Sequence, residues 1–420
     1  MFPVLRQRNF ARLWLGGLVS SFGDWLLALA LPFYLYQQTG SAFASGALFM
    51  VNILPRVVFG SLAGVFVDHW DRRRTMLVAD FARAGLLLLL LPAAVAAGWL
   101  WLCYPIVALE ATISTFFLPA RGALLPHVVS ENELLEANSL DTVSDSFIRL
   151  LAPAVGGALF GLFGLSSILL IDSGSYLFSG LMIWLVRTPR VAPSLTPAET
   201  APLASQWVGL WTEWLAGLRH VGGDRVLRAV FLVQCIAGVA SGIFSPLLPV
   251  FIQKVMQVGP AVLGWMITGT GVGTLLAGLV LGRAGRRWPP IRVGVTGHIL
   301  LGVALFLTFR SRDTWAVVAL SIPAGMGLAC GVGFQTLLQT ITDDQFRGRV
   351  LGALGTTYML LMLIGEALGS LLADTLGVLP LLYTASSFYV LAGLLGLFVL
   401  PAATVGIATA AGQVPDDVGR

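Results

Sequence analysis

The most constraining feature of this chain is a succession of long apolar segments. Each holds roughly 20 residues or more, enough to cross about 30 Å of hydrocarbon as a helix rising 1.5 Å per residue. Hydrophobic residues make up 57% of the chain and charged residues only 11%, whereas a soluble domain has roughly 25% charged residues. The sequence therefore predicts an all-α polytopic membrane protein.

The apolar segments divide the 420 residues into two similar halves. They lie at 10–36, 44–67, 76–97, 100–118, 140–163, 166–186, 226–252, 262–281, 292–309, 315–338, 350–373 and 379–400. We expect twelve transmembrane helices in two six-helix bundles, 1–190 and 226–401, followed by a tail at 402–420. The linker at 191–225 carries Trp207, Trp211 and Trp214, a spacing typical of an amphipathic helix at a membrane surface.

The basic residues mark topology. With a cytoplasmic N-terminus, nearly all loop arginines lie inside, and only Lys254, Arg310 and Arg312 lie outside, so the positive-inside rule predicts that both termini are cytoplasmic. The net charge of +4 is spread over short loops and does not indicate nucleic-acid binding. Neither the cysteines nor the histidines have the spacing of a metal site.

Several charged residues fall within the apolar segments. An ionised side chain there costs at least ~2.5 kcal/mol and is rarely kept without a use. Asp24 and Glu110 lie near the middle of their segments, and Glu366 has no cation nearby in the sequence. Asp80 and Arg83 are three residues apart and predict a local salt bridge, whereas Asp172 is expected near a hydrated helix end.

The first cytoplasmic loop carries a spaced motif. Gly64, Asp68, Arg72 and Arg73 match the G-x-x-x-D-R-x-G-R-R pattern of the major facilitator superfamily, with His69 and Asp71 as departures. The region 64–73 is echoed by 278–287, which predicts parallel six-helix repeats. Physically, such a loop can latch one access state through its carboxylate and arginines. The alternative for the arginines alone is a positive-inside clamp.

The fifth segment adds an exporter-like element. Ala152 to Gly157 resembles the G-P-x-x-G-G element of facilitator exporters. Pro153 removes a backbone donor, and Gly156 and Gly157 permit close helix approach, so a bent, tightly packed helix is expected. Small residues of this kind are also ordinary membrane packing.

The chain as a whole resembles the macrolide-efflux and enterobactin-exporter-like branch of the major facilitator superfamily. The resemblance is carried by 22–25, 116–126, 132–138 and 347–350. It implies a secondary active exporter of a hydrophobic or amphipathic small molecule, such as a drug or siderophore. By the same resemblance, Arg121, Arg347 and Arg349 act together with Gly64, Asp68, Arg72 and Arg73 as a latch that holds one access state.

The resemblance also implies that the first, fourth, seventh and tenth helices line a central cavity. Asp24 and Glu110 would then exchange protons there, with Glu366 in reserve, and drive antiport. An internal ion pair with Arg56 or Arg83 is the alternative, because buried membrane charges often pair. Residues expected to contact substrate are Trp25, Arg56, Gln234, Phe244, Phe334 and Gln335, although packing is the commoner role for such aromatics.

No pattern in the sequence predicts an enzyme. The glycine-rich stretch 269–273 lies inside an apolar segment, where it indicates helix packing rather than phosphate binding. We therefore expect a proton gradient as the energy source, no cofactor or metal, and a monomer in the bacterial inner membrane surrounded by lipid. The alternatives are a lysophospholipid carrier or flippase of the same fold and a transport-fold sensor without flux.

Overall fold

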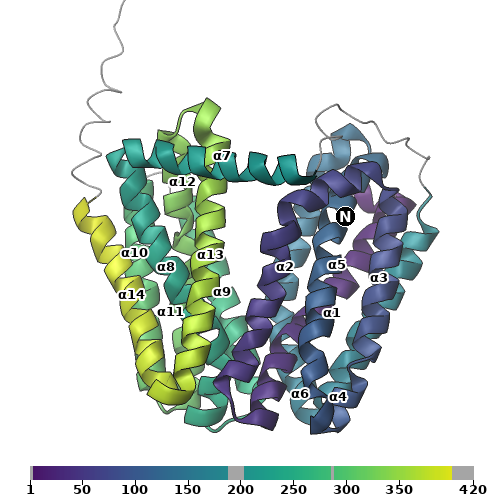
Figure 1. The fold of residues 1–420 in the computed structure, drawn as a ribbon, viewed down its shortest axis with the longest axis horizontal. Coiled ribbons are helices and arrows are strands. Elements are labelled where there is room, and N and C mark those ends of the chain that lie inside the picture. The colour runs from purple at the N-terminus through teal and green to yellow at the C-terminus, as the bar shows by residue number, and fades with distance from the viewer. Residues whose placement is uncertain (1–2, 188–202, 285–287, 400–420) are drawn as a thin grey trace, which may run out of the picture. The chain divides into compact units, whose positions relative to one another are not determined.

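A computed structural model describes residues 3–187, 203–284 and 288–399 of the chain. Within these ranges every regular element is a helix and no strand occurs, and Figure 1 shows the long helices of each part of the chain side by side. The prediction of an all-α membrane fold is therefore confirmed. The physical reason is that a lone strand cannot satisfy its backbone hydrogen bonds in hydrocarbon, whereas a helix does so internally.

The helices follow one another with short connections. The first half contains α1 (Arg8–Thr39), α2 (Ala42–His69), α3 (Arg72–Leu88), α4 (Leu91–Val95), α5 (Cys103–Leu124) and α6 (Leu134–Leu185). The rest contains α7 (Leu203–Gly223), α8 (Arg225–Val250), α9 (Pro260–Ala284), α10 (Pro290–Arg310), α11 (Thr314–Cys330), α12 (Val332–Ile341), α13 (Asp344–Leu376) and α14 (Val378–Val399). A π-helical turn, Phe251–Val255, extends α8.

The membrane crossings agree with the twelve predicted segments. Eleven helical segments of the described residues are long and apolar enough to span a bilayer, and one of them, Glu131–Leu185, holds 55 residues. At 1.5 Å per residue this segment is more than twice as long as the ~30 Å of hydrocarbon. Gly164, with φ of 73°, turns the chain inside it, so α6 supplies both the fifth and the sixth crossing.

Local sequence explains where several helices begin and end. Gly40 has φ of 66° and ends α1, because glycine adopts the left-handed conformation at little cost. Ser41 then caps α2 by accepting a hydrogen bond from the amide of Ala44. At the start of α3, the Asp71 side chain accepts from the amide of Arg74 at 2.9 Å, satisfying an amide that has no partner inside the helix.

Two compact units make up the molecule. The first comprises Met1–Val208, Ile243–Gly271 and Glu366–Leu381, and the second comprises Gly209–Gly242, Val272–Gly365 and Leu382–Arg420. In the first unit α6 packs along α1 and α3, and α5 packs along α2 and α3. In the second unit α10 packs against α11 and α12. Each unit has its own buried apolar core.

Asp374, near the end of α13, joins α13 to α2 inside the first unit. Its carboxylate accepts hydrogen bonds from the Ser41 hydroxyl at 2.8 Å, the Ala42 amide at 2.9 Å and the Phe43 amide at 3.4 Å. Two of these donors are free amides at the N-terminus of α2, where a negative charge is favoured. The contact connects a helix of the first half of the chain with one of the second half.

The predicted linker helix is present as α7, which in Figure 1 runs crosswise to α8 and α13. The side chains of Trp211 and Trp214 pack with ring centroids 4.8 Å apart. Trp214 also donates to the Thr357 hydroxyl of α13 at 3.2 Å, so α7 is anchored within the second unit. The surroundings of Trp207 and residues 188–202, at the start of the linker, lie outside the described part of the structure.

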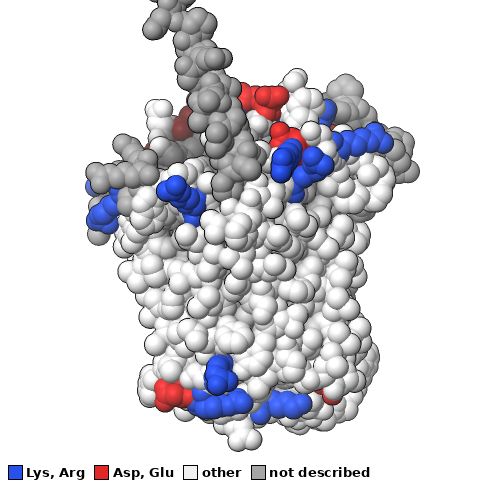
Figure 2. Space-filling model, turned by 90° about the vertical axis from the view of Figure 1, so that its left-hand side faces the viewer, with Lys and Arg blue, Asp and Glu red and all other residues white. Residues whose placement is uncertain are grey.

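The surface carries its charges at two levels. Figure 2 shows an uncharged band between a lower rim and an upper rim of charged side chains. Charged side chains are costly in hydrocarbon and are kept at the interfaces. The band is therefore the part of this face that the lipid chains cover.

Candidate functional site

Two of the acids predicted inside the membrane, Asp24 and Glu110, meet in the first unit. Asp24 lies on α1 and Glu110 on α5, and Tyr176 of α6 lies between them. The Tyr176 hydroxyl donates a hydrogen bond to Asp24 and lies 3.1 Å from Glu110 Oε1. Tyr176 is 1% exposed, whereas the Glu110 side chain keeps 17% exposure. The two acids chosen from the sequence therefore belong to one site, and both are partly exposed.

Arg83 of α3 supplies a positive charge to this site. Its guanidinium lies 2.5 Å from Asp80 and 3.9 Å from Glu110. The same group lies over the rings of Tyr176, at 4.2 Å, and Phe117, at 4.6 Å. These rings offer their electron-rich faces to the cation. The local salt bridge predicted for Asp80 and Arg83 exists, and it is buried. Arg83 also lies near Glu110, which agrees with the alternative that Glu110 pairs with Arg83.

Asp172 is the acid that the sequence interpretation misplaced. It is fully buried rather than hydrated, because α6 turns it toward α1. A Cβ built on Gly23 of α1 would lie 2.3 Å from Asp172 Oδ1, and the Ser175 hydroxyl lies 3.2 Å from that oxygen. Its other oxygen has no hydrogen-bond partner among the described residues. The four-residue spacing of Asp172 and Tyr176 is the signal that could have placed both on one helix face.

Two further arginines lie near Asp24 or its chain neighbour Trp25. Arg56 of α2 is exposed and close enough to Asp24 and Glu110 to act on both electrostatically. Arg149 of α6 lies over the Trp25 ring at 5.4 Å. Both Trp25 and Arg56 were predicted to contact substrate. Arg56 acts on the two acids, and the Trp25 ring packs against the Arg149 guanidinium.

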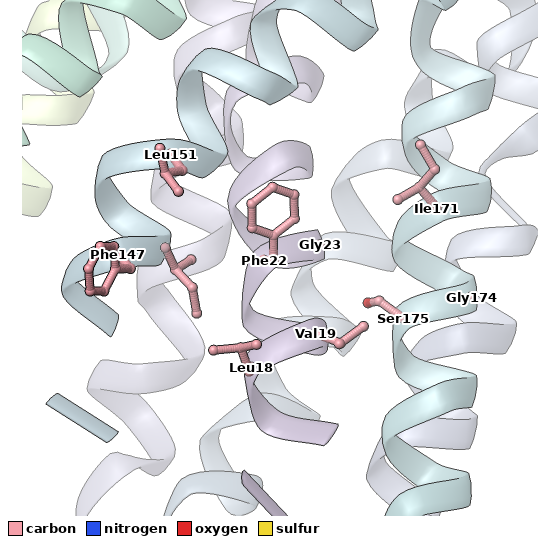
Figure 3. Close-up of a pocket in the computed structure, with 10 residues that line it drawn as sticks. Leu18, Val19, Phe22, Gly23, Phe147, Leu151, Ile171, Gly174 and Ser175 are labelled. Atoms are coloured by element: carbon pink, nitrogen blue, oxygen red, sulfur yellow. The ribbon is translucent and has the colours of Figure 1, made fainter. Parts of the chain in front are cut away.

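An apolar pocket of about 430 Å³ lies beside this site. In Figure 3, α1 runs between two segments of α6, and side chains from all three line the pocket. Leu18, Val19 and Phe22 come from α1, Phe147, Ile148 and Leu151 from one segment, and Ile171, Gly174 and Ser175 from the other. Ser175 and Gly23 form the wall next to Asp172. The pocket suits a hydrocarbon or aromatic group.

Glu366 of α13 is a separate buried acid. It is fully buried, and neither carboxylate oxygen has a hydrogen-bond partner in the described part of the chain. One turn further along α13, the Ser370 hydroxyl is also without a partner. A Cβ on Gly46 of α2 would lie 1.8 Å from that hydroxyl, so α2 and α13 pack closely here. An unpaired ionised acid in such a place is costly.

The predicted latch residues contact their own unit. Arg72 donates to the carbonyl of Ala123 at 3.1 Å, and Arg73 donates to the carbonyls of Ile183, at 3.1 Å, and Trp184. Cations are favoured at helix C-termini, so these arginines join the start of α3 to the ends of α5 and α6. Gly64 and Asp68 belong to α2, but their surroundings lie outside the described side chains.

The other latch arginines have different settings. Arg121 of α5 pairs with Asp141 of α6 at 2.7 Å, and both are about one-fifth exposed. Arg347 pairs with Asp344 of its own helix at 2.6 Å in an exposed position. Arg349 is exposed, and its carbonyl is approached by Gly217 of α7.

The exporter-like element of the fifth segment lies at close helix contacts. A Cβ on Gly156 would lie 3.0 Å from the Leu26 side chain of α1, and one on Gly157 would lie 2.5 Å from the Pro260 carbonyl of α9. Pro153 contributes its carbonyl to the contact with Gly264 of α9, where a Cβ would come within 2.2 Å. This part of α6 therefore packs against α1 and α9.

The remaining predicted substrate residues lie on α8 and α12. Phe334 of α12 is fully buried in the core of the second unit, and its ring centroid lies 5.1 Å from that of His298. Phe334 therefore has the packing role that was the alternative to substrate contact. Gln335 is exposed, and Gln234 has a buried oxygen without a partner among the described residues. Phe244 lies half-buried on α8.

The fold and its buried charges define a polytopic membrane transporter. Residues 1–412 match the transmembrane secretion effector family of major facilitator transporters, and the chain belongs to that family. Its family is one of transporters rather than enzymes.

Named relatives and solved structures agree with this assignment. The chain is 28% identical to the uncharacterized MFS-type transporter YfiS of Bacillus subtilis, over 94% of each chain. It is 26% identical to macrolide efflux protein A of Streptococcus pyogenes, over 88% of this chain and 90% of that protein. It is also 26% identical to the multidrug efflux pump Tap of Mycolicibacterium fortuitum, over 91% and 93%. A bacterial homologue of the iron transporter ferroportin shares the fold, with a TM-score of 0.73 at 18% identity over 93% and 98% of the two chains.

Proposed function

We propose that this transporter exports a hydrophobic or amphipathic small molecule in exchange for protons, with Asp24 and Glu110 as the coupling acids. The observation that carries the proposal is the contact of both acids with the Tyr176 hydroxyl inside a membrane-spanning bundle. Export as the direction is supported by the relatives, which include a macrolide efflux protein and a multidrug efflux pump.

The geometry supports a cycle in which Glu110 and Asp24 exchange protons with water. Both acids are partly exposed, which gives protons a route to a site whose other members, among them Tyr176 and Asp172, are buried. Arg83 keeps its contact with Asp80, so it neutralises one acid and leaves others to bind protons. Rocking of the two six-helix halves, 1–190 and 226–401, would expose the site to each side in turn. Arg72, Arg73, Arg121, Arg347 and Arg349, with Gly64 and Asp68, would steady one access state.

We place the protein, as a monomer, in the bacterial cytoplasmic membrane with both termini in the cytoplasm. The loop arginines support this orientation. Trp25 and Arg56 are the substrate contacts that we propose first, because Arg56 acts electrostatically on both acids and Trp25 follows Asp24 on α1. Gln234, Phe244 and Gln335 would contribute from α8 and α12.

Neutral substitutions of the coupling acids test the proposal. Asp24→Asn and Glu110→Gln are each expected to abolish efflux driven by an imposed pH gradient in proteoliposomes, because an amide cannot take up and release the proton. Glu366→Gln is expected to weaken this flux without abolishing it, since that acid lies apart from the pair. Flux of a fluorescent amphipathic dye is the measurement, with folding checked by size-exclusion chromatography.

Exposed acids offer matched controls for these variants. Asp145→Asn on α6 and Glu213→Gln on α7 change the same groups at exposed positions and should leave the flux unchanged. Full proton-driven flux in both Asp24→Asn and Glu110→Gln would exclude these acids as the coupling site.

A lipid carrier or flippase is the second candidate, favoured by the apolar pocket beside α1. Phe147 and Leu151, which line it, are 58% and 51% exposed, so a lipid chain could enter from the side. If lipid is the substrate, lysophosphatidylcholine should displace a bound fluorescent drug from purified protein, and Leu151→Trp should weaken that competition by filling the pocket. For a drug exporter we expect competition by other drugs and none by the lysolipid.

A further inference from the structure

Tyr176 places a single hydroxyl between two carboxyl groups. Its oxygen contacts Asp24 Oδ1 and lies 3.1 Å from Glu110 Oε1. A phenol carries one hydrogen and can therefore donate one full hydrogen bond at a time. The two contacts cannot both be donations from Tyr176.

Counting hydrogens shows which protonation state fits this arrangement. If both acids are ionised, one carboxylate faces the lone pairs of the phenol oxygen, and two like charges lie close together. If one acid carries a proton, that acid donates to the phenol oxygen while the phenol donates to the other carboxylate. Both contacts are then hydrogen bonds. The geometry therefore matches a pair that holds one proton.

The surroundings fix the hydroxyl in this position. The Tyr176 ring is buried and lies 4.2 Å below the Arg83 guanidinium, and Arg83 is itself held at 2.5 Å from Asp80. The other charged groups facing the pair are Asp172, one turn earlier on α6, and Arg56 of α2. The ring thus has little freedom to move away from either acid.

We propose that Tyr176 is a positioning residue that makes Asp24 and Glu110 bind protons as one unit, with one proton shared between them over a wide pH range. The inference rests on the proposed function, in which these acids exchange the transported proton. In each cycle a second proton would bind to the pair or leave it, while Tyr176 holds the first. Only a proton moves, from a carboxylic acid oxygen to water or back.

Tyr176→Phe removes the hydroxyl and keeps the ring over Arg83. In the purified full-length protein, the infrared band of protonated carboxylic acids can be followed against pH, and its loss in Asp24→Asn and Glu110→Gln assigns it. Interacting acids release their protons in two separate steps. We expect the two steps to come closer together in Tyr176→Phe by about one to two pH units, the size of one hydrogen bond to a charged group.

Tyr34→Phe is the matched control. The Tyr34 hydroxyl is also buried in the first unit, but it donates to the Ala93 carbonyl at 3.0 Å, so its loss should leave the two steps in place. An unchanged separation in folded Tyr176→Phe would overturn the inference. If the steps converge while both Asp24→Asn and Glu110→Gln still transport with the pH gradient, the inference holds and the proposed coupling fails. If Asp24→Asn is inactive and the steps do not converge, only the role of Tyr176 fails.

Discussion

Replacing Arg83 by methionine is expected to lower the free energy of unfolding by about 3–5 kcal/mol, the cost of removing one partner of a buried ion pair. The Arg83 and Asp80 side chains are 3% and 0% exposed, so water cannot replace the lost partner. Methionine keeps much of the packing against Phe117 and Tyr176. A denaturing-detergent titration, supported by thermal unfolding, measures the change.

Two further variants separate the charge effect from packing. In Arg83→Met with Asp80→Asn the carboxylate closest to Arg83 is neutral as well, and part of the lost stability should return, giving a coupling free energy of about 0.5–3 kcal/mol. Arg121→Met breaks a pair that is about one-fifth exposed and should cost only about 0–1 kcal/mol. Equal losses of unfolding free energy in Arg83→Met and Arg121→Met would contradict the conclusion that burial makes the Arg83 ion pair costly to break.

Gly273→Ala should destabilise the second unit by about 1–3 kcal/mol, the usual cost of overfilling a packed contact. A Cβ at Gly273 of α9 would lie 1.9 Å from the Ile322 carbonyl oxygen of α11 and 2.9 Å from the Met326 amide nitrogen. Both obstacles are backbone atoms, so no side chain can rotate away and the two helices would have to separate. Thermal unfolding of the detergent-purified protein gives the readout.

The same helix provides the control for this prediction. A Cβ at Gly278 would meet no atom within 4 Å, so Gly278→Ala should be neutral or stabilising by up to about 1 kcal/mol, the gain in helix propensity. Because the two substitutions are chemically identical and five positions apart on α9, a difference between them reports the contact alone. Similar unfolding midpoints for the two variants would refute the close approach of α9 and α11.

The distribution of charge in the first unit bears on how the site works. Arg83 lies among Asp24, Asp80, Glu110 and Asp172, with its shortest contact to Asp80, and Arg56 acts on Asp24 and Glu110. The four acids outnumber the two guanidinium groups, and a charge left unpaired in a poorly hydrated site is unfavourable. Protons supply the missing positive charge most simply. This imbalance is the physical link between the structure and the proposed antiport.

Some features could be read from the sequence because they depend on local composition. The crossings follow from segment length and hydropathy, since the bilayer imposes one thickness on every span. Asp24 and Glu110 stood out because a charge in an apolar segment is costly wherever that segment packs. The linker helix followed from the spacing of its tryptophans.

Other features could not be read from it because they depend on how helices rotate and pack. Hydropathy along a span does not say which face meets which neighbour, so Asp172 was misplaced and Tyr176 was overlooked. The sequence by itself determined the class of fold, the number of crossings and the presence of costly acids, because each depends on residues near in the chain. Only the tertiary structure brought Asp24, Glu110 and Arg83 to the Tyr176 ring, because that contact depends on the packing of four helices far apart in the chain.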